Sequence, residues 1–117
     1  YPAALKSVIS VTAVDARLDL FKDAVRGDQI DFAAPGVDVF VDVGDGGRFV
    51  SGTSIAAPFV SARLAAETAR IVSEAIDALA ADAIDIGPIG RDPLFGRGLV
   101  QAPRDCRAPA AAAALQP

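Results

Sequence analysis

The sequence contains no histidine, no methionine and no tryptophan. Imidazole is the usual proton shuttle near neutral pH, so a hydroxyl nucleophile in this chain has no such base within the chain itself. A zinc site built on histidine is excluded for the same reason. The single cysteine, Cys106, excludes an internal disulfide, and we interpret it as a passive thiol that does not decide the cellular compartment.

Long apolar runs and an excess of positive charge are also absent. No apolar stretch approaches the ~20 residues that a membrane-spanning helix needs, so we expect no membrane segment. The formal net charge of -4 disfavours binding to nucleic acid, because an acidic surface repels phosphate. The 117 residues, 52% of them hydrophobic, suit one small domain or part of a larger one. Because the chain begins at Tyr1 and shows no signal peptide, we expect a fragment or a processed product.

The first half of the chain has the residue patterns of β-strands. Residues 8–14 are β-branched and almost all apolar, which predicts a strand buried on both faces. Residues 29–34 predict a second strand, stopped by the Pro-Gly pair that follows. Residues 37–43 alternate valine with aspartate or phenylalanine, which predicts a half-buried strand. A glycine-punctuated extended segment is expected at residues 95–100.

The apolar period changes to that of a helix at Thr53. We expect this helix to run to about Ile71, with Pro58 in its early turns, where proline is least disruptive. A second helix is predicted over residues 73–83, with Ser73 as its N-cap. Strands followed by helices indicate an α/β fold. Because few helices are predicted, the first predicted strand would be incompletely covered, and we expect further chain to bury it.

One segment has the residue pattern of a catalytic site. Gly52 allows a tight approach of the backbone immediately before the helix, and Ser54 then lies at the helix N-terminus. Free N–H groups and the positive end of the helix dipole would stabilise an oxyanion that forms when the Ser54 hydroxyl attacks a carbonyl. Taken alone, the same pattern also fits Thr53 or Ser54 acting simply as a helix cap.

Four motifs in the same order resemble the subtilisin-like serine proteases. The nucleophile signature Gly-Thr-Ser-x-Ala-x-Pro of that family is matched by Gly52-Thr53-Ser54-Ile55-Ala56-Ala57-Pro58. The other matches are Tyr1-Pro2-Ala3-Ala4 with the strand after it, Asp31-Phe32-Ala33-Ala34-Pro35-Gly36-Val37, and Phe95-Gly96-Arg97-Gly98-Leu99-Val100-Gln101-Ala102. The resemblance implies a partial subtilisin-like three-layer α/β fold. Residues 1–102 would be the C-terminal part of the catalytic domain, followed by a Pro/Ala-rich flexible tail at residues 103–117.

The resemblance also implies roles for individual residues. Ser54 corresponds to the nucleophile, and its backbone N–H to one donor of the oxyanion hole. Gly52 and Thr53 would shape the turn from strand to helix. Tyr1, Pro2 and Ala3 correspond to a segment near the floor of the substrate pocket. Ile55 stands where the family usually has methionine, and Phe59 where it has a non-catalytic histidine.

The catalytic aspartate and histidine of the family, and the asparagine of its oxyanion hole, precede this region and are missing. We therefore expect the chain alone to be inactive, because an unactivated serine hydroxyl is a poor nucleophile. A Ser–Lys pair could replace the histidine only if Lys6 or Lys22 were buried beside Ser54, which their sequence contexts do not favour.

No cofactor or metal is expected within this chain. Aspartates gather at positions 15, 19, 23 and 28, and again at 42 and 45, but without the spacing of an EF-hand, so we interpret them as solvated charge. The resemblance implies that the full-length protein can bind calcium. It also implies peptide or protein substrates, the upstream half of the catalytic domain as a partner, and a secreted or cell-envelope location.

Three functional hypotheses stay open. The first is part of a serine endopeptidase that acts only when joined to its upstream portion. The second is a non-catalytic interaction module in which a protease fold survives without its chemistry. The third is a fragment whose exposed strand edges pair with another copy.

Overall fold

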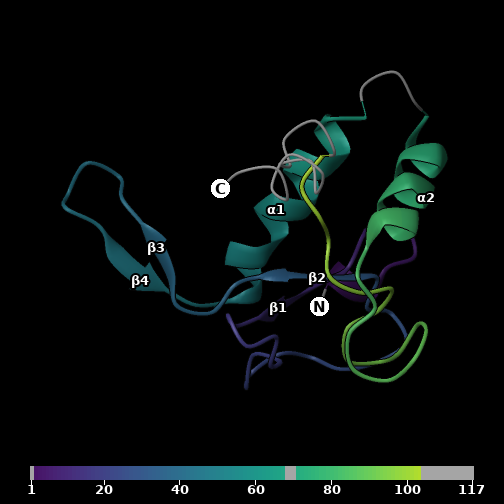
Figure 1. Ribbon diagram of the computed structural model, residues 1–117, viewed down its shortest axis with the longest axis horizontal. Helices are drawn as coiled ribbons and strands as arrows, with labels where there is room; N and C mark the ends of the chain where they lie inside the picture. Colours follow the sequence, from purple (N-terminus) through teal and green to yellow (C-terminus); the bar gives the residue numbers. More distant parts are fainter. Residues whose placement is uncertain (1, 68–70, 104–117) are drawn as a thin grey trace, which may run out of the picture.

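The computed structural model describes residues 2–67 and 71–103. It contains a 3₁₀ helix, four strands and two α-helices (Figure 1). The elements are η1 (Pro2–Ala4), β1 (Val11–Val14), β2 (Phe32–Pro35), β3 (Val39–Val41), β4 (Arg48–Val50), α1 (Thr53–Ala65) and α2 (Val72–Asp82). Tyr1, Cys106 and the expected tail, apart from Pro103, lie outside the described residues.

A small parallel sheet forms the centre of the molecule. Strands β1 and β2 pair in parallel, with Val11 opposite Phe32 and Val14 opposite Pro35. On the other side of β2, Leu99 bridges Ala33 in the parallel sense. The predicted extended segment at residues 95–100 therefore contributes a short stretch of pairing to the sheet.

Both faces of the sheet are covered. On one face, β1 and β2 pack against both helices, in a core formed by Ala13, Phe32, Ala34, Ala56, Val60 and Leu79. On the other face, Val14 and Ala33 pack against Phe95. This arrangement confirms the prediction of a strand buried on both faces, and the mixture of a parallel sheet with packed helices confirms the α/β class.

Several predicted boundaries were wrong. Val8 is 41% exposed, and the first strand begins only at Val11. Helix α1 ends at Ala65 rather than near Ile71. Ile71 is instead the N-cap of α2, without a side-chain capping bond, so Ser73 lies inside that helix and does not cap it.

The antiparallel pair β3 and β4 forms a hairpin that projects away from the sheet and helices (Figure 1). The rings of Phe40 and Phe49 meet edge to face across it, with centroids 5.5 Å apart. The prediction of a half-buried strand holds for Val39 and Val41 but was wrong for Val43, which is 72% exposed beyond the end of β3. A projecting hairpin has little to pack against, so alternation in its sequence does not guarantee a buried face.

None of the helices in residues 2–67 and 71–103 is long and apolar enough to cross a membrane.

Leu79 fixes α2 to the sheet, and its replacement tests this core. Its side chain is 1% exposed and packs with Ala13, Phe32 and Val60. We expect Leu79→Ala to lower the free energy of unfolding by about 2–5 kcal/mol, because the cavity adds to the lost transfer energy. Chemical denaturation measures the change. Leu5→Ala is the matched control, because Leu5 is 60% exposed and should change stability by less than about 0.5 kcal/mol.

Candidate active site

Two glycines join the end of the sheet to the start of α1. The N–H of Gly52 donates to the carbonyl of Gly36 at 2.8 Å, immediately after β2 and before the helix. Gly52 is the N-cap residue and has φ 154° and ψ 157°. A side chain is strained at this φ, and a Cβ at this position would lie 3.4 Å from the Ser54 hydroxyl oxygen. Glycine therefore makes the turn and keeps the space beside Ser54 open.

Position 36 requires glycine for a different reason, which is that no side chain fits there. Its φ is not in the left-handed region, but a Cβ there would lie 2.6 Å from the Cβ of Ala13 and 2.8 Å from the carbonyl oxygen of Gly52. It would also lie 3.0 Å from the Cβ of Ala56 on α1. The glycine of the Ala-Pro-Gly motif thus sets how closely the nucleophile turn approaches the sheet. The sequence revealed the motif but not this close contact. The only sign of the contact in the sequence was a glycine directly after a predicted strand.

Ser54 is the second residue of α1, and its side chain is exposed. The carbonyl of Gly52 accepts from the N–H groups of Ile55 and Ala56, at 3.0 and 3.3 Å. This leaves the N–H groups of Thr53 and Ser54 as helix-terminal donors without an acceptor in the preceding turn. Such donors favour negative charge close to the Ser54 oxygen.

The capping interpretation does not fit this geometry. Gly52, not Thr53 or Ser54, occupies the N-cap, and no side chain caps the helix. Within the described part of the chain, the hydroxyl of Ser54 has no hydrogen-bond partner. An exposed serine hydroxyl without a structural hydrogen bond is available for chemistry, although no described side chain accepts its proton.

Pro58 is the sixth residue of α1 and so lies beyond the first turn. In a regular helix the N–H at this position would donate to the carbonyl of Ser54, and proline has no N–H. The expectation that Pro58 falls where proline is least disruptive was therefore wrong by about one turn. Its consequence is local, because the carbonyl that loses its helical donor is that of Ser54.

No base stands beside Ser54 in the described residues. Lys6 and Lys22 are both exposed, whereas a Ser–Lys pair needs a buried lysine. Asp42 and Asp45 act within the β3–β4 hairpin, where they accept from the N–H groups of Gly44 and Gly47. Residues 2–67 and 71–103 therefore provide a nucleophile position and helix-terminal donors, and neither lysine nor either of these two aspartates is placed to take the serine proton.

The residues expected near the substrate pocket are placed only in part. Pro2 and Ala3 form the exposed helix η1, and Tyr1 lies outside the described residues. Their role in a substrate pocket stays a prediction.

The glycines of the Phe-Gly-Arg-Gly motif have a structural role. Gly96 has φ 59° and Gly98 has φ 119°, both in the region that favours glycine. Side chains there would collide with the backbone of Asp31 and of Ile84 respectively. The motif thus lets the segment after Phe95 lie directly against the sheet.

Metal binding by the chain's own side chains finds no support in the described residues. No three aspartate, glutamate or cysteine side chains among residues 2–67 and 71–103 are grouped so that they could hold a metal ion. Asp15, for example, accepts from the N–H groups of Arg17 and Asp19 and so closes a local turn. Calcium binding by the full-length protein stays a prediction.

Comparison with known proteins relates this geometry to a family. No protein-family model matches the chain. The minor extracellular protease Epr of Bacillus subtilis (strain 168) is 33% identical in an alignment of 112 positions that covers 86% of this chain and 16% of Epr. The crystal structure of a lanthipeptide protease superposes with a TM-score of 0.73 and 25% identity, over 85% of this chain and 40% of that one. The chain thus spans about a sixth of the curated relative. The two matches confirm the resemblance to part of a subtilisin-like serine protease that the four motifs indicated.

Proposed function

We propose that this chain carries the nucleophile of a subtilisin-like serine endopeptidase. The hydroxyl oxygen of Ser54 attacks the carbonyl carbon of a peptide bond, and a tetrahedral oxyanion forms. The backbone N–H of Ser54 donates to that oxyanion, and the peptide bond then breaks to leave an acyl-enzyme, which water hydrolyses.

The observation that carries the proposal is the position of Ser54. Its exposed hydroxyl has no partner in the described residues, and it lies where α1 presents unpaired N–H groups. Gly52 and Gly36 hold the turn in place by a 2.8 Å hydrogen bond between backbones. The match to an extracellular protease supports the same activity, and by extension a secreted location, for this chain.

The base must come from elsewhere in the proposed enzyme. A histidine would take the proton of Ser54 and later give it to the leaving amine, an aspartate would orient that histidine, and an asparagine would complete the oxyanion hole. In subtilisin, loss of the serine or the histidine alone lowers kcat by about 10⁶. This chain has no histidine, so we expect it to be inactive by itself.

Labelling with a fluorophosphonate probe tests this proposal. The probe reacts with activated serines, so we expect labelling of the full-length protease at Ser54 and none of the isolated chain. The peptide that carries the label is identified by mass spectrometry. Labelling of the isolated chain would mean that a base is present within it, and Lys6→Ala and Lys22→Ala would show whether a lysine serves.

A second function, that of a non-catalytic interaction module, is favoured by the apolar surface of the hairpin. Phe40 is 57% exposed and Phe49 is 69% exposed, which is unusual for phenylalanine. If neither the chain nor the full-length protein reacts with the probe, the interaction module replaces the enzyme as the proposed function.

A further inference from the structure

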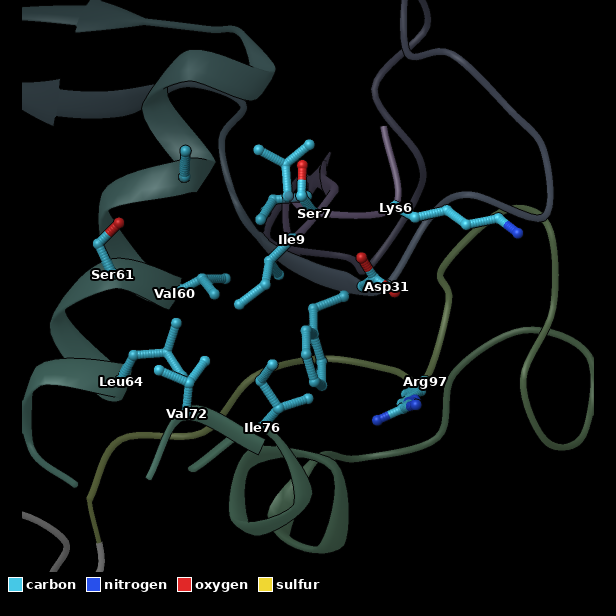
Figure 2. A pocket seen from close by; sticks show the side chains of 14 residues that line it. Lys6, Ser7, Ile9, Asp31, Val60, Ser61, Leu64, Val72, Ile76 and Arg97 are labelled. Carbon is cyan, nitrogen blue, oxygen red and sulfur yellow. The ribbon is translucent and has the colours of Figure 1, made fainter. Parts of the chain in front are cut away.

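The cavity in Figure 2 lies beside β1, between the segment that precedes this strand and the two helices. It has a volume of about 490 Å³, and Ile9, Val60 and Ile76 are among the apolar side chains that line it. We expect the upstream part of the domain to cover this surface, so its apolar lining indicates no ligand. A contact that is complete within the described residues lies instead at the end of β2, where the β3–β4 hairpin joins the turn before α1.

The two chain segments at the base of the hairpin are out of step by one residue. The β3–β4 ladder begins with Val39 opposite Val50. Before the ladder, the N–H of Gly52 donates to the carbonyl of Gly36 at 2.8 Å. Two residues separate these contacts on the first segment, and one residue separates them on the second. This unequal count is that of a β-bulge, which interrupts the ladder and redirects the chain.

The side chain of Ser51 closes this bulge. Ser51 is the single residue on the second segment, and Asp38 is one of the two residues opposite it. Asp38 has φ 52°, a left-handed conformation that residues other than glycine seldom adopt. The N–H of Asp38 donates to the hydroxyl oxygen of Ser51 at 2.8 Å. The hydroxyl therefore supplies an acceptor where the ladder is interrupted, and it holds Asp38 in its unusual conformation.

Ser51 connects the hairpin directly to the turn that carries Ser54. It follows the last residue of β4 and precedes Gly52, the N-cap of α1. The backbone bond between Gly52 and Gly36 holds one point of this connection, and a second point is needed to fix its direction. A rotation of the chain at Ser51 would displace the hydroxyl and the backbone N–H of Ser54 together. Since Asp38 and Ser51 are both exposed, water can replace a lost bond between them, so its loss should change the geometry of the turn more than the free energy of unfolding.

We propose that Ser51 is a positioning residue for the nucleophile. Its hydroxyl accepts from the N–H of Asp38 and so fixes the direction in which β4 enters the turn before α1. Ser54 then presents its hydroxyl and its backbone N–H to the same substrate carbonyl. Ser51 itself takes no part in the bond changes. This inference rests on the proposed function, because it needs Ser54 to be the nucleophile.

Replacing Ser51 with alanine in the proposed full-length protease tests the proposal. We expect the labelling rate with the fluorophosphonate probe and kcat each to fall about tenfold, because a small displacement of a nucleophile is enough for such a loss. KM should stay within about twofold of the native value, because the lost bond does not bind substrate. Ser51→Thr keeps a hydroxyl that can accept from the N–H of Asp38, so it should retain at least about half of the native labelling rate and kcat.

Two further measurements separate positioning from stability. Ser73→Ala is the matched control, because Ser73 is an exposed serine on α2 and lies outside the turn before α1, and this variant should be labelled at the native rate. Hydrogen exchange measured by NMR on the 117-residue chain follows the N–H of Asp38 directly. It should exchange faster in Ser51→Ala than in the native chain, and Ser51→Thr should restore the slower exchange. Chemical denaturation verifies that each variant keeps the native free energy of unfolding.

The possible outcomes distinguish this inference from the proposed function. If the native full-length protein is not labelled at Ser54, the proposed function fails and the role of Ser51 fails with it. If the native protein and Ser51→Ala are labelled at equal rates, only the role of Ser51 is wrong. The same conclusion follows if Ser51→Thr is as slow as Ser51→Ala, or if the loss appears in KM and not in kcat.

Discussion

If the proposed function is right, replacing Ser54 with alanine should lower kcat of the proposed full-length protease by about 10⁶, the loss that removal of the nucleophile causes in subtilisin. Substrate binding should change little, because the hydroxyl of Ser54 makes no structural hydrogen bond in the described residues and its side chain is exposed. For the same reason, the free energy of unfolding should change by less than about 0.5 kcal/mol. Hydrolysis of a chromogenic peptide and chemical denaturation measure the two effects.

Ser61→Ala is the matched control for this experiment. Ser61 is exposed on the same helix, two turns after Ser54, and it does not share the helix N-terminus. We expect its replacement to leave kcat unchanged. If Ser54→Ala retained more than about a hundredth of the activity, another residue would be the nucleophile and the catalytic role of this site would be wrong.

The start of the helix that carries Ser54 was easier to predict from the sequence than its end. The helix starts at Thr53 as predicted, because the glycine at position 52 and the change of period mark that boundary locally. The predicted C-terminal end of this helix was wrong, because the alanines around residue 65 favour a helix and no residue there marks its end. The buried face of α1 includes Arg63, which pairs with Glu67 at 2.6 Å and reaches Asp82 of α2 at 3.7 Å. An apolar pattern cannot reveal a buried charge that depends on such partners.

Contacts between distant residues could not be predicted. The parallel pairing of β1 with β2 joins segments about twenty residues apart, and its register depends on which side chains share the core. The hydrogen bond between Gly36 and Gly52 likewise follows from the packing of α1 on the sheet. The motifs indicated candidate residues along the chain, but the physical reason for the glycine at position 36 appeared only in the structure.

Gly36→Ala should reduce kcat/KM of the proposed full-length protease by about 10², although the new methyl group contacts no reacting atom. The new methyl group cannot fit between the Cβ of Ala13 and the carbonyl of Gly52, at 2.6 and 2.8 Å, so the turn that carries Ser54 must move away from the sheet. A displacement of about 1 Å at a nucleophile is enough for a loss of this size. Overpacking should also lower the free energy of unfolding by about 1–3 kcal/mol.

The comparison with Gly44→Ala distinguishes displacement of Ser54 from a general loss of stability. Gly44 has φ 93°, so alanine is strained there by about 1–2 kcal/mol, but a Cβ meets nothing within 4 Å. Both variants should therefore be destabilised to a similar degree, whereas only Gly36→Ala should label slowly with the fluorophosphonate probe under conditions in which both are folded. Equal labelling rates would show that the contact of Gly36 with Gly52 supports the fold and does not position the nucleophile. A slow rate in Gly36→Ala alone would make the spacing between sheet and helix a determinant of the activity of Ser54.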